Sequence, residues 1–484
     1  MKKLTDILKN TPVREVCGDT AAAIGGLVYD SRAVKPGDCF FAVPGTQSDG
    51  HDYIPIAVEK GAAAIVCERM PADAAEGVAY VLVGDSAGAM ADMAAAFYDY
   101  PSRELKLVGI TGTNGKTTTA TLLYDLVRAM GYKAGLISTV VYKIDGREVE
   151  ATHTTPDSIR LNAMMREMAD AGCAYCFMEC SSHAIVQERT RGLDFAGGIF
   201  SNITHDHLDY HKTFAEYIRA KKLFFDGLPK GAFALTNADD RNGRVMVQNT
   251  AAAVSAYSLR AMADFRCKIV EMHLDGMLLR IDGQELWVGL LGRFNAYNLL
   301  AVYGAAVLLG LDRSEVLRVL SVLHAVSGRF EKVRAANGTT AIVDYAHTPD
   351  ALENVIQTIG EIRTPGQQLI VVCGCGGDRD RTKRPEMAAI AVKYATTAVF
   401  TSDNPRHESP EAILDDMVAG LEPGARYLRI ADRAEAIRTA VMLSRPGDII
   451  LVAGKGHETY QIVGDVKHPF DDREEIKKRF ALLN

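Results

Sequence analysis

A glycine-rich loop between a strand-like run and a helical pattern sets the strongest constraint on the fold of this chain. Residues 109–119 read GITGTNGKTTT, and the apolar run LKLVGI leads into them. Apolar side chains then recur at helical spacing until Gly131, a plausible helix stop. The side chains of that helical face are Leu122, Leu123, Leu126, Val127 and Met130. A second strand-like run, AGLIST, follows, so the sequence predicts a strand–helix–strand unit.

The residues of this loop are of the kind that binds nucleotide phosphates. Backbone N–H groups at a helix N-terminus attract phosphate, Lys116 would neutralise its charge, and Thr117 can ligate Mg²⁺. The strict P-loop pattern is missed, because Ile110 stands where its first glycine belongs. A relaxed match can arise by chance, but the flanking strand and helix are the context that a P-loop requires. The sequence therefore predicts nucleotide binding.

Strand-like and helical patterns alternate from Ser327 to the end of the chain. The strand-like runs are TTAIVDY, QLIVVCG, TTAVFTS and DIILVAG. This alternation predicts a parallel sheet covered by helices on both faces, with ligands beyond the carboxyl ends of the strands. Four polar segments follow directly on those strands: DYAHTPD, CGCGGDRDRTKRP, SDNPRHES and AGKGHE. Arg406 is not needed for the turn that the preceding Asp-Asn-Pro indicates, so we expect it at this ligand-binding rim rather than on a solvated turn.

The length of 484 residues is too great for one ordinary core. The patterns divide the chain into blocks 1–103, 104–327 and 328–484, and the first block ends with a helical stretch from Ala87 to Tyr98. With 48% hydrophobic and 24% charged residues, the composition is that of a globular protein. No run approaches the roughly 20 apolar residues that span a bilayer, and polar residues interrupt the N-terminal MKKLTDILKN, so neither membrane insertion nor a signal peptide is expected.

Charge and cysteine usage narrow the function classes further. A net charge of −7 without a long basic stretch argues against nucleic-acid binding. The nine cysteines are scattered, and the one CxxC pair, Cys173 and Cys176, lacks the second pair that a zinc site needs. Buried reduced thiols are the favoured interpretation, which is consistent with a cytoplasmic protein.

Two further polar segments, FMECSSHAIVQER and NITHDHLDYH, follow strand-like runs of the second block. Glu179 and His207 could complete a magnesium site that Thr117 begins. The residues of the second segment also resemble a zinc cluster, and a solvated polar loop is a third interpretation. They are His205, Asp206, His207, Asp209 and His211. A carboxylate beside a P-loop favours Mg²⁺, which prefers hard oxygen ligands and phosphates.

The motifs taken together resemble those of the Mur ligases of bacterial cell-wall synthesis. In chain order they are TGTNGKTTT, MECSSHAI, NITHDHLDYH, LLGRFNAYN, SGRFE, DYAHTPDAL, GGDRDRTKRPEM, DNPR and AGKGHE. The resemblance covers nearly the whole chain and is closest to the ligases that add the third residue of the stem peptide to UDP-N-acetylmuramoyl-L-alanyl-D-glutamate. It implies an α/β enzyme of three domains: a smaller N-terminal α/β domain that binds the UDP end, a central P-loop ATPase domain with a mainly parallel sheet, and a C-terminal Rossmann-like domain that binds the amino acid.

The resemblance also implies roles for individual residues. ATP and its phosphates would contact Gly112, Thr113, Asn114, Gly115, Lys116, Thr117, Thr118, Asn298, Arg329 and Asp344. The UDP-substrate would contact Tyr29, Ser31, Thr46, Gln47, Ser48, Thr154, Thr155, Ser181, Gln187 and Arg189, together with His153, which stands where similar enzymes often have asparagine. The segment RAKKLFF matches the place of a carbamylated lysine, and the alignment favours Lys221 over Lys222. A carbamate is chemically a carboxylate, so this lysine would become a magnesium ligand beside Thr117, Glu179 and His207. The catalytic set would be Lys116, Glu179, His207, Lys221 and Arg329.

The amino acid is predicted from the chemistry of the rim. Meso-diaminopimelate differs from lysine by a carboxylate on its distal carbon, and arginine binds a carboxylate through two parallel hydrogen bonds. Arg406 would hold that carboxylate, Arg379 the other one, and Glu458 the distal ammonium. Asp403, Asn404, Pro405 and Gly454 complete the predicted site.

Other functions stay open. The same ligation with L-lysine or another diamino acid, a folylpolyglutamate-type or other Mur ligase, a P-loop ATPase switch without ligase activity, and a non-catalytic nucleotide-binding protein are the alternatives. The expected partners are small molecules only (the UDP-dipeptide, meso-diaminopimelate, ATP and Mg²⁺), and a monomer is expected.

Overall fold

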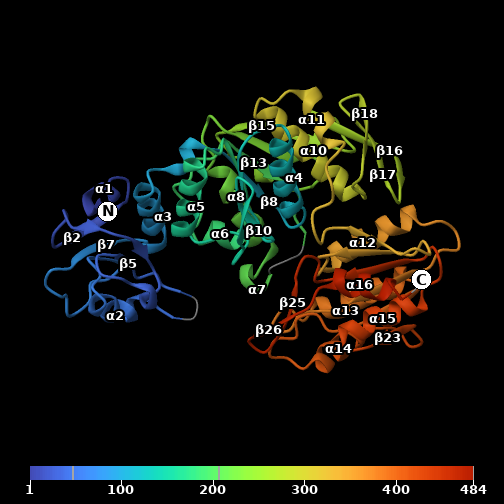
Figure 1. The fold of residues 1–484 in the computed structure, drawn as a ribbon. Coiled ribbons are helices and arrows are strands. Elements are labelled where there is room, and N and C mark those ends of the chain that lie inside the picture. The colour runs from blue at the N-terminus through green and yellow to red at the C-terminus, as the bar shows by residue number, and fades with distance from the viewer. Residues whose placement is uncertain (46–47, 205–207, 483–484) are drawn as a thin grey trace.

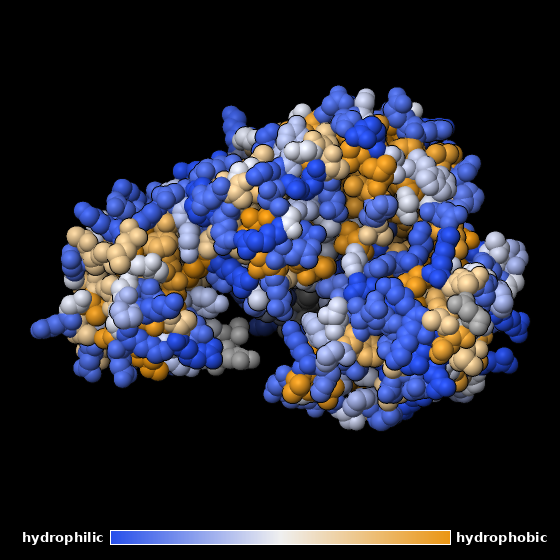
Figure 2. Space-filling view, viewed as in Figure 1, coloured by the Kyte–Doolittle hydropathy of each residue, from blue (hydrophilic) through white to orange (hydrophobic). Residues whose placement is uncertain are grey.

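The computed structural model describes residues 1–45, 48–204 and 208–482, and it contains three large sheets that follow one another along the chain (Figure 1). The fold class predicted from the sequence, a mainly parallel α/β architecture in three parts, is confirmed. Each sheet lies within one predicted block, but the block boundaries themselves stay predictions. Hydrophilic side chains cover most of the face seen in Figure 2. Within the described ranges, no helix has both the length and the apolar character that crossing a membrane requires.

The N-terminal sheet has five strands in the order β2-β7-β6-β5-β4. Their bounds are β2 Val13–Cys17, β4 Leu27–Val28, β5 Cys39–Phe41, β6 Ala64–Cys67 and β7 Ala79–Val83. All pairs are parallel except β2 with β7. Apolar clusters cover both faces, one against α3 (Ser86–Phe97) and the other against α2 (Ile54–Glu59). The predicted helix from Ala87 to Tyr98 is therefore confirmed within one residue at each end.

The central sheet has eleven strands in the order β11-β10-β9-β12-β8-β13-β14-β15-β16-β17-β18. Its parallel middle comprises β8 Lys106–Thr111, β9 Ala134–Ile137, β12 Tyr175–Glu179, β13 Gly197–Phe200, β14 Phe233–Asn237 and β15 Ala253–Ser258. Antiparallel strands flank it: β10 Val141–Ile144 and β11 Arg147–Glu150 on one side, and β17 Gly276–Ile281 and β18 Gln284–Val288 on the other. Strand β16 Phe265–His273 joins the two parts, because it pairs parallel with β15 and antiparallel with β17. The predicted strand–helix–strand unit is β8, α4 (Lys116–Ala129) and β9. Gly131 has a φ of 87°, a left-handed conformation that suits glycine and ends the helix.

Helices position the site residues of the central sheet. They are α5 Ser158–Asp170, α6 Ser182–Val186, α7 Leu208–His211, α8 Phe214–Asp226, α10 Arg293–Leu308 and α11 Arg313–Leu320. Helix α4 packs against both α10 and the strands β9 and β12. Because α4 is buried on that side, its N-terminus stays fixed at the end of β8, where the phosphate loop lies.

The cap of α8 permits a test of how this helix is held. Thr213 is extended, and its Oγ1 accepts a hydrogen bond from the backbone N–H of Glu216 at 3.2 Å. Replacing a capping threonine by alanine leaves that N–H without its partner and costs about 1 kcal/mol. We expect Thr213→Ala to lower the free energy of unfolding in urea by about that amount. Thr213→Ser keeps the hydroxyl and is the control; equal stabilities of the two variants would contradict the role of the cap.

The C-terminal sheet has six strands in the order β19-β20-β24-β21-β22-β23. The strands are β19 Glu331–Arg334, β20 Thr340–Asp344, β21 Leu369–Cys373, β22 Thr397–Phe400, β23 Tyr427–Arg429 and β24 Ile449–Ala453, and all pairs except β19 with β20 are parallel. A separate hairpin, β25 Tyr460–Val463 and β26 Val466–Pro469, follows β24. The predicted parallel sheet is confirmed.

Helices cover both faces of the C-terminal sheet. They are α12 Pro349–Ile362, α13 Lys383–Tyr394, α14 Pro410–Val418, α15 Arg433–Leu443 and α16 Asp472–Phe480. Alternate strand residues face opposite sides, so Ile342 and Leu451 pack with α12, α13 and α14, while Val343 and Val452 pack with α15 and α16. Continuous apolar strands of this kind are typical of a sheet that is buried on both faces.

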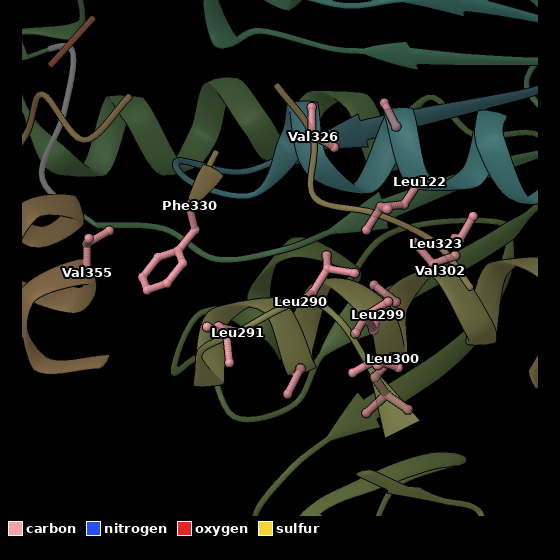
Figure 3. Packing of buried hydrophobic residues seen from close by; sticks show 14 of the residues in the cluster. Leu122, Leu290, Leu291, Leu299, Leu300, Val302, Leu323, Val326, Phe330 and Val355 are labelled. Carbon is pink, nitrogen blue, oxygen red and sulfur yellow. The ribbon is translucent and has the colours of Figure 1, made fainter. Parts of the chain in front are cut away.

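One apolar cluster extends from the central sheet into the C-terminal domain. It contains Leu290 and Leu291, which precede α10, and also Phe330 and Val355 of the C-terminal block. Figure 3 shows Phe330 beside these leucines, with Val355 on its other side. The two domains therefore share apolar packing next to the phosphate loop.

Candidate active site

The glycine-rich loop runs from the end of β8 to the start of α4, and two of its glycines are sterically required. Gly112 has a φ of 148°, and a Cβ there would lie 2.0 Å from Oγ of Ser201. Gly115 has a φ of 87°, and its Cβ would lie 2.4 Å from Oδ1 of Asn298. Ile110 is a fully buried residue of β8, so the strand continues through the position at which the strict P-loop pattern has glycine. The loop is therefore tightly enclosed by Ser201 and Asn298.

Lys116 and Thr117 open α4 at the end of this loop. The Lys116 ammonium folds back and donates hydrogen bonds to the carbonyl oxygens of Gly112 and Thr113, at 2.9 and 2.8 Å. Thr117 is buried, and its Oγ1 accepts a hydrogen bond from the Arg329 guanidinium at 3.2 Å. An ammonium and a guanidinium thus meet at a helix N-terminus, an arrangement that attracts phosphate.

A cavity of about 570 Å³ lies over the loop and is lined by both the central and the C-terminal domain. Its wall includes the loop residues from Thr113 to Thr118 together with Glu179, Lys221, Asn298, Arg329 and Asp344. Arg329 stacks over the ring of Tyr345 at 4.5 Å. Asp344 accepts backbone hydrogen bonds from Phe330 and Ala346, and burial raises its pKa while Arg329 opposes that shift. The predicted ATP-binding residues of all three segments therefore surround one space.

The structure distinguishes the two neighbouring lysines of α8. Lys221 is 1% exposed, lines the cavity, and donates to the carbonyl oxygen of Gly112 at 2.8 Å. Lys222 instead forms an ion pair with Asp226 one turn further along the helix. Only the ammonium of Lys221 points toward the phosphate loop, which supports the choice between the two made from the sequence.

Glu179 ends β12 and lines the same cavity as Lys221. It is 1% exposed, and its Oε1 accepts a hydrogen bond from the backbone N–H of Thr139 at 2.7 Å. His207, the predicted third protein ligand, lies outside the described residues, as do His205 and Asp206 of the alternative zinc cluster. His211 is described, and its Nε2 lies 2.8 Å from Oγ of Ser182. Across the described ranges, no three His, Cys, Asp or Glu side chains lie close enough to hold a metal ion by themselves.

Sequence reasoning missed Asp350, which reaches the phosphate loop from the C-terminal domain. Its Oδ2 accepts hydrogen bonds from Nδ2 of Asn114 at 2.8 Å and from Oγ1 of Thr204 at 3.3 Å. Burial raises the pKa of Asp350. The residue ends the segment DYAHTPD, so the polar motif was visible in the sequence, but its partner across the domain boundary was not.

The residues predicted to hold the muramoyl-dipeptide form one hydrogen-bonded group at the carboxyl ends of β9 and β12. Arg189 donates to the carbonyl oxygen of Thr155 and twice to Oε1 of Gln187. Oγ1 of Thr155 donates to the carbonyl oxygen of Glu179, and Ser181 caps α6. Thr154 lines the cavity and accepts from Thr139 at 3.1 Å. The structure thus brings this set next to Glu179.

His153 and the predicted substrate-binding residues described in the N-terminal block lie outside the hydrogen-bonded group beside Glu179. The backbone of His153 bonds to the hydroxyl of Tyr142, and its exposed ring lies 3.3 Å from Oγ1 of Thr152. Tyr29 and Ser31 follow β4, and Ser48 follows the adjacent parallel strand β5, so they lie at one edge of that sheet. Burial raises the pKa of Tyr29, which also interacts with Asp157 and Arg189 of the central domain. Thr46 and Gln47 lie outside the described residues.

The polar segments of the C-terminal block meet at one edge of its sheet. Asp344 pairs with Ala453, and Cys373 with Phe400, so β20, β24, β21 and β22 end together. Asp403, Asn404 and Pro405 are buried at this edge. Gly454 has a φ of 116°, and a Cβ there would lie 2.4 Å from Oδ2 of Asp403. The rim predicted from the four polar segments is therefore present.

Arg406 lies in this rim in a left-handed conformation with a φ of 52°. Its backbone is held between Ile462 and Gly464 of the hairpin β25–β26, and its guanidinium donates to the carbonyl oxygen of Gly377 at 2.9 Å. Burial, and next the neighbouring Arg379, lower the pKa of Arg406. Among the described residues, neither Arg379 nor Arg406 forms an ion pair within 4 Å. Two adjacent guanidinium groups without a carboxylate partner are suited to an anionic ligand.

Three consecutive parts of the chain match models of known protein domains. Residues 23–98 match the model of the Mur ligase family catalytic domain, residues 110–306 the Mur ligase middle domain, and residues 328–456 the glutamate ligase domain of Mur ligases. The UDP-N-acetylmuramoyl-L-alanyl-D-glutamate–2,6-diaminopimelate ligase of Phocaeicola vulgatus is 55% identical over 481 residues, with 99% of each chain covered. The chain belongs to the Mur ligase family. The ligase of the same name from Bacteroides fragilis is also 55% identical, with the same coverage.

Solved structures of Mur ligases have the same fold. One of a UDP-N-acetylmuramoyl-L-alanyl-D-glutamate–2,6-diaminopimelate ligase is 31% identical with a TM-score of 0.71, and the match covers 100% of this chain and 99% of the other. The MurF ligase of Thermotoga maritima in complex with ADP is 19% identical with a TM-score of 0.65 over 94% and 96% of the two chains, which is a likeness of fold alone. Membership of this ligase family confirms that the chain is a ligase.

Proposed function

We propose that this protein is the ATP-dependent ligase that joins meso-diaminopimelate to the D-glutamate γ-carboxylate of UDP-N-acetylmuramoyl-L-alanyl-D-glutamate, a step of peptidoglycan precursor synthesis. The names and full coverage of the relatives support this reaction. The observation that carries the choice of amino acid is the pair Arg379 and Arg406, two adjacent guanidinium groups next to the acidic Glu458. Meso-diaminopimelate has carboxylates at both ends, whereas lysine has one.

The chemistry follows from the residues around the cavity. The γ-carboxylate of D-glutamate attacks the γ-phosphorus of ATP, ADP leaves, and an acyl phosphate forms. Lys116 and Arg329 are placed to spread the negative charge of that transfer. The amine of diaminopimelate then attacks the acyl carbon, and the tetrahedral intermediate expels phosphate to leave an amide, while the amine loses its proton to solvent. Residues of both domains line the cavity, so their approach would exclude water from the acyl phosphate.

Hard oxygen ligands for magnesium are present beside the phosphate loop. Thr117 Oγ1 and the buried Glu179 carboxylate both line the cavity, and a carbamylated Lys221 would add a second carboxylate. These donors fit Mg²⁺ rather than a softer metal. His207 would be a further ligand. When bound, Mg²⁺ would neutralise charge on the phosphates during transfer.

The amino-acid specificity gives the direct test. Wild-type protein is incubated with ATP, Mg²⁺, the UDP-dipeptide and either meso-diaminopimelate or L-lysine, and the UDP-tripeptide is quantified by chromatography. Without the distal carboxylate, Arg406 would stay half-buried and unpaired, so we expect a preference for diaminopimelate of about a hundredfold in kcat/KM. Arg406→Ala should lose most of the activity with diaminopimelate and narrow that gap.

The control for this test is Arg438→Ala, which removes an exposed arginine that pairs with Glu435 on α15. It should leave both activities unchanged. Equal use of lysine and diaminopimelate by the wild type would refute the assignment of Arg406 while leaving a ligase. ATP hydrolysis that needs neither the UDP-dipeptide nor an amino acid would instead favour a P-loop ATPase of another class.

We further propose that the protein works in the cytoplasm as a monomer on small-molecule substrates. The reduced state of the cysteines supports the compartment: Cys39, Cys176, Cys180 and Cys373 are buried, and all nine cysteines are free thiols. The cavity is completed by two domains of one chain, so the site needs no residue from a second copy.

A further inference from the structure

Lys455 is an ammonium group enclosed in the rim of the C-terminal sheet. It belongs to the segment AGKGHE after β24, and its side chain is 0% exposed. A buried ammonium is costly unless it is fully paired, so the groups that surround it are informative. Its Nζ lies 2.9 Å from Oε2 of Glu458 and 3.1 Å from Oδ1 of Asn404, and 5.6 Å from the ring centre of Tyr460.

The two partners of Lys455 are also bonded to each other. Nδ2 of Asn404 donates to the same Oε2 of Glu458 at 2.8 Å, and Oδ1 of Asn404 accepts a further hydrogen bond from the backbone N–H of Ile462 at 2.9 Å. Lys455, Asn404 and Glu458 therefore form a closed triangle that fixes the orientation of the Asn404 amide. The amide of Asn404 is thus oriented by contacts within the protein, and its place in the predicted diaminopimelate site stays a prediction.

The two carboxylate oxygens of Glu458 differ in their hydrogen bonds. Oε2 receives both protein hydrogen bonds, whereas Oε1 accepts none from any residue that the structure describes. The side chain is 14% exposed, so the carboxylate is reachable from the rim. A carboxylate with one oxygen anchored and the other left for a ligand is a preorganised acceptor for an ammonium group.

We propose that Lys455 is a positioning residue for amino-acid specificity: it locks Asn404 and Oε2 of Glu458, so that Oε1 of Glu458 is presented to an ammonium group of the incoming diamino acid. This inference rests on the proposed function, because it concerns the same amino-acid site. Lys455 touches no substrate in this arrangement and acts through Glu458.

A purely structural role for Lys455 makes a different prediction. If Lys455 only stabilises the domain, replacing it would lower the stability of the protein and weaken the binding of all three substrates together. A positioning residue affects the substrate that its partner binds. The discriminating quantity is therefore the KM for diaminopimelate compared with the KM values for ATP and for the UDP-dipeptide.

The test uses the full-length protein and the variant Lys455→Met, which keeps an unbranched apolar stem and removes the ammonium group. We expect the KM for meso-diaminopimelate to rise about thirtyfold, which corresponds to the loss of one charge-assisted hydrogen bond of about 2 kcal/mol. The KM values for ATP and for the UDP-dipeptide should stay within about twofold. Lys455→Arg, which keeps the charge, should recover part of the loss.

A double-mutant cycle tests whether Lys455 acts through Glu458. In a Glu458→Gln background, Lys455→Met should raise the KM for diaminopimelate by less than about threefold, because the group that it positions is already gone. Additive effects of the two substitutions would overturn the proposal. An equal rise in all three KM values would overturn it too.

Lys467→Met is the matched control. Lys467 also lies over the ring of Tyr460, at 4.3 Å, but is exposed on β26 and belongs to no part of the triangle. It should behave as wild type. If thermal unfolding shows that Lys455→Met does not fold, Lys455→Gln, which is polar but uncharged, takes its place, and a KM for diaminopimelate unchanged from wild type in that variant would refute the proposal. Failure of the wild type to form the UDP-tripeptide with diaminopimelate is a separate result, which would refute the proposed function itself.

Discussion

Lys221→Ala is expected to lose ligase activity by a thousandfold or more, because the substitution removes the carboxylate that a carbamylated Lys221 would give to Mg²⁺ at the transferring phosphoryl group. Charge stabilisation by a metal ion contributes several kcal/mol to such a transfer. Lys221 is buried at the cavity wall and donates to the carbonyl oxygen of Gly112 at 2.8 Å, so the lost ligand belongs to the space next to the phosphate loop. Added bicarbonate should not restore the activity, since alanine has no amine to carbamylate.

The modification itself can be observed separately from activity. Wild-type protein equilibrated with ¹³C-bicarbonate should show a carbamate resonance in the ¹³C spectrum, and Lys221→Ala should not. Lys222→Ala is the matched control, because Lys222 is the next residue of the same helix and pairs with Asp226. It should keep both the resonance and the activity. A resonance that survives in Lys221→Ala and disappears in Lys222→Ala would reverse the assignment.

Lys116→Ala is expected to reduce the rate of acyl-phosphate formation by a hundredfold to a thousandfold, which corresponds to about 3–4 kcal/mol of transition-state stabilisation. The physical reason is that its ammonium lies at the N-terminus of α4, within 2.9 Å of two loop carbonyl oxygens. From there it would stabilise the negative charge of the γ-phosphate during transfer. Binding of the UDP-substrate should survive, because Tyr29, Ser31 and Ser48 lie on a different sheet.

The measurement is ATP-dependent release of phosphate in the presence of the UDP-dipeptide and diaminopimelate, with calorimetric titration of the UDP-dipeptide alongside it. Lys133→Ala provides the control, since Lys133 is an exposed lysine that pairs with Asp145 away from the loop. A Lys116→Ala protein within threefold of the wild-type rate would show that the loop is not the catalytic site. Loss of UDP-substrate binding would show instead that the variant has lost more than its phosphate contact.

Local patterns predicted much of the fold. The runs LKLVGI and DIILVAG became β8 and β24, because short apolar runs bounded by glycine fit strands that are buried on both faces. The phosphate loop and the polar rim were found for a related reason: in a parallel sheet, whatever follows the strands must gather at one edge. Strand order was not predicted, since it depends on contacts between residues that lie far apart in the chain.

The parts of the site that the sequence left open depend on side-chain direction. Lys221 and Lys222 are neighbours in the chain, but successive residues of a helix point about 100° apart, so only one can face the loop. The backbone of Arg406 is fixed by pairing with the hairpin β25–β26, which no pattern near DNPR indicates. Asp350 and Lys455 belong to recognised segments, but their partners become visible only when the chain is folded.

The apolar cluster that joins Leu290 and Leu291 to Phe330 and Val355 has a thermodynamic consequence. Because these residues exclude water together, separating the central and C-terminal domains would expose apolar surface on both, and their folding equilibria are coupled. A nucleotide bound in the neighbouring cavity would therefore stabilise the C-terminal domain as well as the domain that carries the phosphate loop, through the same free energy of binding. Nucleotide binding would in this way also raise the stability of the amino-acid rim, including residues that do not contact the nucleotide.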